Sequence, residues 1–318
     1  MYIVRQGIRH SLPDMLLLYK ALTRGEWMKN NRFVAAVLIP ALSLLTLFIV
    51  IPILGSFYFS LFDYNPLRSI NVFLGLDNYK RLITDPVFIK SFKNTLVFVS
   101  VTVSINIAIT LMLANFIARI ERKWLRNLFL VCIFLPCVAP VANSAVIWSR
   151  SLFPTKGGLL NLITQGIADK TINWVGAPAL LMPALILFTV WVDIGYNTVL
   201  FTAGIDGIPK DLYEAADIDG VGPFNRFFRI IFPLLGRTFT FVTAMTLISH
   251  FQMFAQFEII ARNGGPGRAG QVLTTYIYYA GFKAKDMGYA SAISVILFLL
   301  ILVVTLIQQR ANRVDWRY

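Results

Sequence analysis

Charged residues, cysteine and histidine are all scarce in this chain. Only 14% of its 318 residues are charged, against about 25% in an average soluble domain, whereas 57% are hydrophobic. The two cysteines, Cys132 and Cys137, lie in one apolar run, which excludes a disulfide-stapled secreted fold. Two histidines, His10 and His250, are too few for a histidine metal site or a Ser/His/Asp catalytic group. The composition is that of an integral membrane protein.

A nucleotide-binding loop is also missing. The nearest approach to a phosphate loop is Gly265 to Gly270, but Gln271 and Val272 stand where Lys and Ser/Thr are required. We therefore expect that this chain is not an enzyme and that it holds no cofactor or metal of its own.

Positive charge is in surplus, with 29 Lys and Arg against 16 Asp and Glu. In a chain this apolar, the net charge of +13 indicates basic loops that orient a membrane protein, and we expect no nucleic acid partner. Six Lys and Arg precede Phe33, and four lie in the short link from Arg119 to Asn127. The positive-inside tendency then places both termini and the 119–127 and 203–237 links in the cytoplasm.

Six segments are long and apolar enough to cross a bilayer, which needs roughly 20 residues per helix. They are residues 33–61, 96–118, 128–148, 177–202, 239–261 and 287–307. The predicted fold is therefore all-α and integral to the membrane, with six transmembrane helices in a domain over residues 33–308.

Two terminal segments flank this domain. Residues 1–32 are expected to form a cytoplasmic N-terminal segment, and residues 309–318 a cytoplasmic tail. Residues 11–32 mix Leu, Met, Trp and Lys, so both an amphipathic helix along the inner surface and a plain solvated tail fit them.

The cytoplasmic segment 205–233 carries more local structure than a connector needs. Pro209 suits the first turn of a helix, Asp211 and Glu214 are acids near its N-terminus, and Gly220 and Gly222 can stop it. The pattern predicts a short helix, a tight glycine turn and a second short helix outside the bilayer. Its small face is formed by Ala215, Ala216, Asp219 and Gly220, and would let another protein approach the backbone closely.

This segment resembles the EAA loop of the permease subunits of bacterial ATP-binding-cassette importers. The resemblance rests first on Glu214-Ala215-Ala216, on Gly220 after three intervening residues and on Ile231-Phe232-Pro233. It continues, in the order of the carbohydrate-uptake branch, with the following stretches: Phe73 to Tyr79, Asn94-Thr95, Gly157 to Asn161 with Trp174, Gly264-Gly265-Pro266, and Leu273 to Tyr278. Ordered matches from about Phe33 to Gln308 make the resemblance specific.

The resemblance implies a type I importer in the bacterial inner membrane. In that family two permease subunits form the pore, two ATPase subunits bind ATP and Mg below it, and an extracytoplasmic binding protein delivers the solute. The Gly-Gly-Pro stretch resembles the half that pairs with a different, second permease subunit. The helix from Glu214 to Gly222 would couple the pore to the ATPase, with Glu214, Ala215, Ala216, Asp219, Gly220 and Gly222 at the contact.

Polar residues inside the predicted spans are candidates for the solute path, because burying them in lipid is costly. In span five Ser249, Gln252, Met253 and Gln256 have the i, i+3, i+4, i+7 spacing of one helix face. Amides beside a thioether suit a polyhydroxyl ligand. Further candidates are Asp193 and Asn197 in span four, with Trp191 and Tyr196 nearby, and Asn143 and Ser144 in span three after Pro136 and Pro140, which should bend that helix.

For every path candidate, a hydrogen bond to a neighbouring helix is the alternative interpretation. Three other groups of polar residues are expected to have structural roles only. Thr102, Asn106 and Thr110 recur every four residues and indicate helix contact, His250 is expected to pack against a neighbouring span, and Glu258 is expected to pair with Arg262.

The sequence leaves the solute and one alternative function open. A neutral oligosaccharide fits the amides, but polyols, glycerol phosphates and acidic sugars are carried by related permeases. A stand-alone secondary carrier or channel is the alternative, although it would need an inverted repeat or intramembrane charge pairs. Asp193 is the one clearly buried acid in the predicted spans, and no repeat is evident.

Overall fold

The computed structural model describes residues 31–67 and 70–311, which form helices and one small β-hairpin. The expectations for residues 1–30 and 312–318, including the interfacial helix, lie outside this part of the chain. The chain divides into two compact units, residues 1–58 and 59–318. In the described part, four helices are long and apolar enough to cross a membrane, and six if each of two bent pairs is one span.

The described part of the first unit is one apolar helical stretch. It consists of α3 (Asn31–Leu45), a π-helical turn (Thr46–Val50) and α4 (Ile51–Phe59). Its 23 residues from Val37 to Phe59 are long enough to span a bilayer, as the sequence predicts for the first span.

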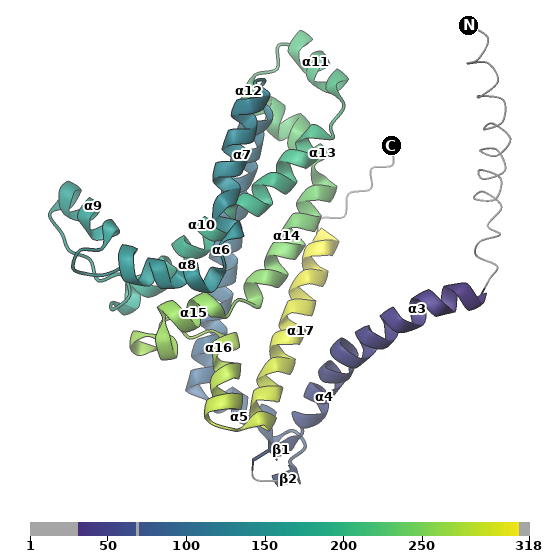
Figure 1. Cartoon of the computed structure of the whole chain (residues 1–318), viewed down its shortest axis with the longest axis vertical. Helices are drawn as coiled ribbons and strands as arrows, with labels where there is room; N and C mark the ends of the chain where they lie inside the picture. Colours follow the sequence, from purple (N-terminus) through teal and green to yellow (C-terminus); the bar gives the residue numbers. More distant parts are fainter. Residues whose placement is uncertain (1–30, 68–69, 312–318) are drawn as a thin grey trace, which may run out of the picture. The chain divides into compact units, whose positions relative to one another are not determined.

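Three long helices run through the second unit (Figure 1): α6 (Pro86–Ala118), α10 (Pro178–Asp206) and α17 (Met287–Ala311). α6 begins at Pro86, earlier than the predicted Leu96, because Asp85 caps it by accepting a 2.8 Å hydrogen bond from the backbone N–H of Val87. The apolar run alone therefore understates the length of this helix.

Two further spans are broken. α7 (Lys123–Val138) and α8 (Val141–Ile147) meet at 90° around Pro140, which confirms the bend expected from Pro136 and Pro140. The second pair bends by 75° at Leu235, where the short helices α12 (Pro223–Arg226) and α13 (Phe232–Leu234) are followed by α14 (Gly236–Phe251) and α15 (Ala255–Ile260). The gap between α14 and α15 breaks the fifth span, which the sequence predicts as a single helix over 239–261.

Short elements join these helices. The hairpin pairs β1 (Phe62–Asn65) with β2 (Ile70–Phe73) in antiparallel register, and the remaining short helices are α5 (Asp77–Thr84), α9 (Leu159–Ala168), α11 (Lys210–Ile218) and α16 (Leu273–Tyr278). Gly288 lets α17 lie against β1, because a Cβ atom at this position would lie 2.0 Å from the carbonyl oxygen of Phe62.

The core of the second unit lies where α10 packs against α6 and α7. Phe98, Phe188 and Phe201 are almost completely buried there. Gly195 allows the close contact with α7, since a Cβ atom there would lie 2.4 Å from the carbonyl oxygen of Ile133. The packed helices hold two clusters of polar residues, one at the end near α11 and one midway along α10.

Candidate functional site

The segment around α11 has the predicted order of a short helix, a glycine turn and a second short helix, but the predicted helix from Glu214 to Gly222 is wrong in its bounds, because the helix covers Lys210–Ile218. Helix α11 ends at Ile218, Gly220 adopts a left-handed backbone with φ of +66°, and Pro223 starts α12. The left-handed conformation favours glycine at this position, so Gly220 acts as the helix stop. In Figure 1 α11 stands clear of the long helices at one end of the second unit.

Five of the six predicted coupling residues are exposed on this segment: Glu214, Ala215, Asp219, Gly220 and Gly222. Ala216 is the exception, with only 3% of its surface exposed, because it faces the chain rather than the solvent. The exposed part of the predicted set therefore excludes Ala216.

Two ion pairs and one tyrosine join α11, α12 and the ends of α10 and α7. Asp217 pairs with Arg226 of α12, and Asp206 at the end of α10 pairs with Arg126 of α7. The hydroxyl of Tyr213 donates a 3.4 Å hydrogen bond to the carbonyl oxygen of Ile205. Burial, together with the nearby charge of Asp206, raises the pKa of Tyr213. Tyr213 is thus the side chain that links α11 directly to α10, and Asp206 links α10 to α7.

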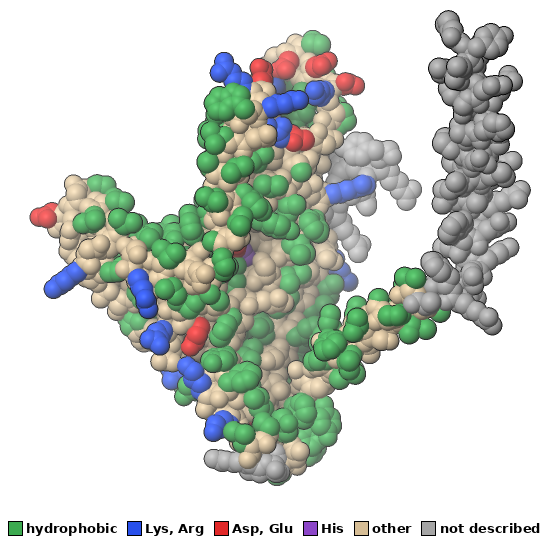
Figure 2. Space-filling view, viewed as in Figure 1, with side chains coloured by type: hydrophobic (Ala, Val, Ile, Leu, Met, Phe, Trp, Pro, Cys, Tyr) green, Lys and Arg blue, Asp and Glu red, His purple; other side chains and the backbone are tan. Residues whose placement is uncertain are grey.

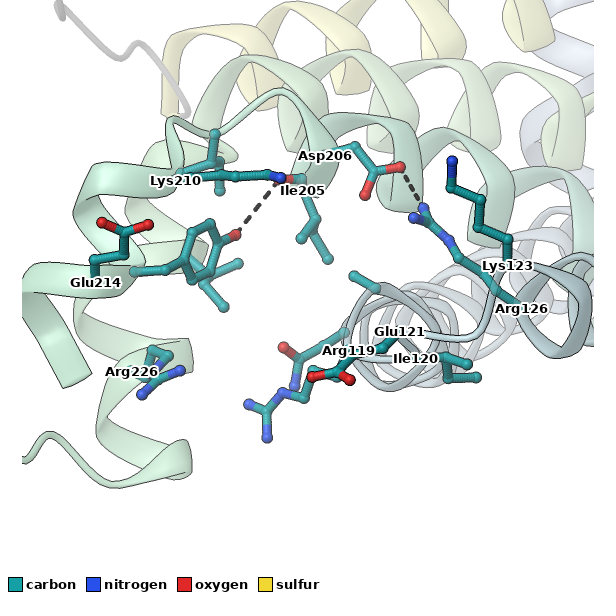
Figure 3. A pocket seen from close by; sticks show the side chains of 15 residues that line it. Arg119, Ile120, Glu121, Lys123, Arg126, Ile205, Asp206, Lys210, Glu214 and Arg226 are labelled. Carbon is teal, nitrogen blue, oxygen red and sulfur yellow. Dashed lines mark hydrogen bonds and ion pairs between the residues drawn. The ribbon is translucent and has the colours of Figure 1, made fainter.

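A cavity of about 640 Å³ lies between α11 and the ends of α6, α7 and α10. Glu214 stands on one side of this cavity, and Lys123 and Arg126 stand on the opposite side (Figure 3). Arg119 and Glu121 also line it, so the basic 119–127 link, which the sequence singles out only for orientation, faces the predicted coupling helix.

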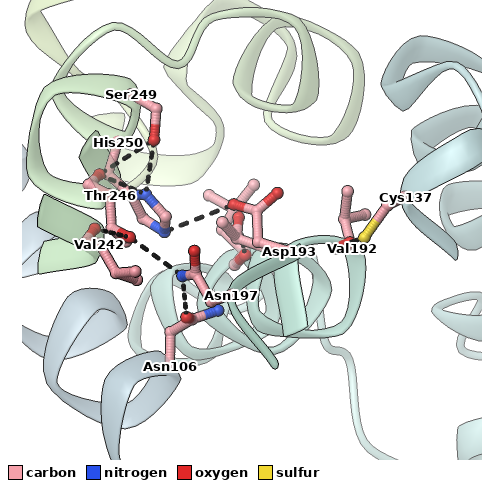
Figure 4. A network of polar contacts seen from close by, with 11 residues as sticks. Asn106, Cys137, Val192, Asp193, Asn197, Val242, Thr246, Ser249 and His250 are labelled. Atoms are coloured by element: carbon pink, nitrogen blue, oxygen red, sulfur yellow. Dashed lines mark hydrogen bonds and ion pairs between the residues drawn. The ribbon is translucent and has the colours of Figure 1, made fainter. Parts of the chain in front are cut away.

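The second cluster joins three spans. The side-chain amide of Asn197 on α10 donates to Asn106 Oδ1 on α6 at 2.6 Å and to Thr246 Oγ1 on α14 at 3.0 Å (Figure 4). All three residues are at most 4% exposed. The predicted helix contact at Asn106 is confirmed, and Asn197, predicted as a path residue, has its amide directed between helices.

His250 extends this cluster toward Asp193. Its Nδ1 lies 2.8 Å from the carbonyl oxygen of Thr246, and because a carbonyl only accepts, Nδ1 carries the proton. Its Nε2 lies 3.6 Å from Asp193 Oδ2, and its ring stacks on Phe98 of α6. The prediction that His250 packs against a neighbouring span is confirmed. Asp193 stays 28% exposed at the edge of the cluster.

The predicted stripe on span five is wrong as a continuous helix face. α14 ends at Phe251, so Ser249 lies on α14, Gln252 and Met253 lie in the break, and Gln256 lies on α15. Ser249 and Gln252 are exposed, whereas Gln256 is buried. The Met253 carbonyl oxygen accepts a 2.6 Å hydrogen bond from Thr274 Oγ1, and this contact holds the break against α16.

The remaining candidates for the solute path also differ in exposure. On α8, Asn143 is exposed and Ser144 is buried, while Trp191 and Tyr196 on α10 keep 36% and 49% of their surface exposed. The predicted pair of Glu258 with Arg262 is wrong, because Glu258 lies 3.4 Å from the Nζ atom of Lys283. The helix end explains the change: α15 stops at Ile260 and Ala261 has non-helical backbone angles, so Arg262 does not lie one helical turn from Glu258.

A family model and solved structures both match this arrangement. Residues 82–313 match the model described as "Binding-protein-dependent transport system inner membrane component". The structure of a bacterial alginate ABC transporter in complex with an alginate pentasaccharide-bound periplasmic protein contains a chain with a TM-score of 0.79 and 21% identity. The match covers 91% of this chain and 96% of that one.

Two curated relatives are similar over most of their length. The arabinooligosaccharides transport system permease protein AraP of Bacillus subtilis is 32% identical over 240 residues, 76% of each chain. The sn-glycerol-3-phosphate transport system permease protein UgpA of Yersinia pestis is 33% identical over 284 residues, 88% of this chain and 94% of the relative.

Proposed function

Since the chain belongs to the family of binding-protein-dependent transport system inner membrane components, we propose that it forms part of the path by which an ATP-driven importer takes up a sugar or oligosaccharide. The family is one of inner-membrane transport components and not a catalytic family. An extracytoplasmic binding protein would deliver the solute to this path.

The exposed helix α11 is the observation that supports ATP-driven coupling. Ala215 and Gly220 leave its backbone accessible, while Tyr213 connects it to the end of α10, which is paired in turn with α7 through Asp206 and Arg126. Two ATPase subunits, with ATP and Mg, would supply the motion, and this chain would transmit it without hydrolysing ATP. A second permease subunit, a different chain, would complete the pore.

Support for a sugar comes from the relatives and from the polar groups at the helix break. AraP is named for arabinooligosaccharides, and Ser249 and Gln252 offer exposed hydrogen-bonding groups where α14 ends. A hydroxyl and an amide both donate and accept, as a polyhydroxyl ligand requires.

Reconstitution tests the proposal. The chain, a second permease, the ATPase subunits and the binding protein are placed in liposomes, and uptake of labelled sugar is measured with and without ATP. Uptake should require ATP and all the subunits. Uptake by this chain alone, in the absence of ATP, would instead support a stand-alone carrier or channel.

A further inference from the structure

A second, smaller cavity of about 230 Å³ lies beside α15 and α16. Its wall includes the side chains of Glu258, Asn263, Arg268, Gln271, Tyr278 and Lys283. Amides, charged groups and an aromatic ring in one small cavity are the polar and apolar contacts that a sugar ring needs. Its volume is below the roughly 300–1,000 Å³ of sites for drug-sized molecules, so it suits one ring rather than a chain of them.

This cavity is lined by more positive than negative side chains. Lys283 Nζ lies 3.4 Å from Glu258 Oε1 and 3.2 Å from Asn263 Oδ1, and it stands over the Tyr278 ring at 5.7 Å. Among the described residues Arg268 makes no ion pair, so one guanidinium group remains in excess. Lys and Arg side chains also gather on the surface over α15 and α16, where few acids appear (Figure 2).

The backbone around the cavity is held in one conformation. Asn94 of α6 donates two hydrogen bonds, at 3.0 Å to the carbonyl oxygen of Arg268 and at 2.8 Å to that of Gln271. Gly264 has φ of +85°, and a Cβ atom there would lie 2.3 Å from Gln271 Oε1. Arg268 itself has φ of +57°, a backbone conformation that residues other than glycine rarely adopt. The guanidinium group is thus presented by an ordered loop.

The cavity is connected to the break in the fifth span. Tyr278, on its wall, packs against Phe254 with ring centroids 5.2 Å apart, and Thr274 on the same helix holds the Met253 carbonyl. Gln252 and Met253 are among the predicted path residues. A ligand in the cavity would therefore lie against the helix that fixes the geometry of the break.

We propose that this cavity binds one sugar residue that carries a carboxylate group, with Arg268 and Lys283 holding the carboxylate. Asn263 and Gln271 hydrogen-bond the ring hydroxyls, and Tyr278 supplies an apolar wall. The site deepens the proposed function and rests on it, because it assigns acidic saccharides as solutes that the importer accepts.

Binding is tested with the full chain in lipid nanodiscs, using free glucuronate as the probe and glucose as its uncharged counterpart. Saturation-transfer NMR or calorimetry should detect glucuronate and should show weaker binding of glucose. Arg268→Gln should weaken glucuronate binding roughly tenfold or more, as expected for loss of a charge-assisted hydrogen bond. Arg268→Lys should retain part of the affinity.

The matched control is Arg262→Gln, an exposed arginine of the same loop that does not line the cavity. It should leave glucuronate binding unchanged. The absence of glucuronate binding to the wild-type chain, equal binding of glucose, or an equal loss in the Arg262 control would each overturn the proposal. ATP-dependent uptake of a sugar without glucuronate binding would refute this site alone, whereas binding without any uptake by the assembled system would refute the proposed function alone.

Discussion

The Nε2 atom of His250 faces the Oδ2 atom of Asp193 across 3.6 Å, between α14 and α10. Nδ1 of the same ring is directed at the carbonyl oxygen of Thr246, which leaves Nε2 as an acceptor. Two acceptors therefore face each other unless one proton is shared between them. Nε2 is fully buried and has no hydrogen-bond donor among the described residues, so this contact is a weak point in the packing of the spans.

The first prediction is that Asp193→Asn stabilises the chain. The amide can donate a hydrogen bond to Nε2 where a carboxylate cannot, and a gain of about 1 kcal/mol is expected. The measurement is the thermal unfolding midpoint in detergent at pH 8, and Asp193→Ala is the comparison because it removes the facing acceptor without adding a donor. An Asn variant no more stable than the Ala variant would contradict this account of the pair.

The second prediction concerns the amide that joins three spans. Asn197→Leu removes the amide that donates hydrogen bonds to Asn106 and Thr246, so the buried oxygen atoms of these two residues lose their donor. The free energy of unfolding should fall by about 1–3 kcal/mol. Asn143→Leu is the control, because Asn143 is exposed on α8 and should change stability little. The free energy of unfolding of both variants is measured by denaturation in detergent. An equal decrease in the two variants would argue against a structural role for Asn197.

The third prediction separates the two adjacent alanines of α11. Ala215 is exposed, so Ala215→Trp should leave membrane insertion and unfolding temperature unchanged while abolishing ATP-dependent uptake through obstruction of the partner surface. Ala216 is 3% exposed, so Ala216→Trp should lower the unfolding temperature as well. Insertion, thermal unfolding and uptake are measured on both variants. Wild-type uptake by the Ala215 variant would remove α11 from the coupling contact.

The fourth prediction is a pH dependence at the start of α6. Burial alone would raise the pKa of Asp85, but hydrogen bonds from Tyr276 and Tyr289, together with the backbone N–H groups of Val87 and Phe88, more than offset it and lower that pKa. Burial and the hydrogen bond to Asp85 raise the pKa of Tyr276 to about 12. Asp85 therefore joins the beginning of α6 to α16 through Tyr276 and to α17 through Tyr289.

The direction of this pH dependence follows from the linkage between proton binding and folding. A carboxyl whose pKa is lowered by folding stabilises the folded state above its unfolded pKa of 3.8, and this contribution disappears as the pH falls through the lower folded value. The stability advantage of the wild type over Asp85→Asn should therefore be present at pH 6 and shrink below about pH 4. Thermal unfolding from pH 3 to 7 measures it, and a difference that does not change with pH would show that the Asp85 charge contributes nothing.

Most of the fold follows from local patterns. The apolar runs identify the membrane spans, Pro136 and Pro140 predict the bend between α7 and α8, and Pro209 with Gly220 predicts α11 and its end. Each of these features depends on residues close together in the chain, such as a proline ring or a glycine in a left-handed turn. The ordered motifs likewise identify the family, which the match over residues 82–313 confirms.

The arrangement of the candidate solute-path residues is harder to predict from the sequence than the fold. Helical spacing placed Ser249, Gln252, Met253 and Gln256 on one face, but no proline or glycine marks the break after Phe251. The contact of Thr274 with the Met253 carbonyl, 21 residues away, accompanies the break, and a pattern within one helix does not contain it. The partner of Glu258 is missed for the same reason, since Lys283 lies 25 residues further along the chain.

Apolar length, turn residues and ordered motifs are local properties, and they predict a membrane protein of this permease family, the approximate positions of its spans and the α11 segment. Which polar groups meet depends on how the helices pack. Asn106, Asn197 and Thr246 come from three helices, and Arg268 and Lys283 come together at one cavity through the folding of the loops around α16. A polar side chain in a membrane segment needs a partner, and the packing of helices selects that partner from positions distant in the chain.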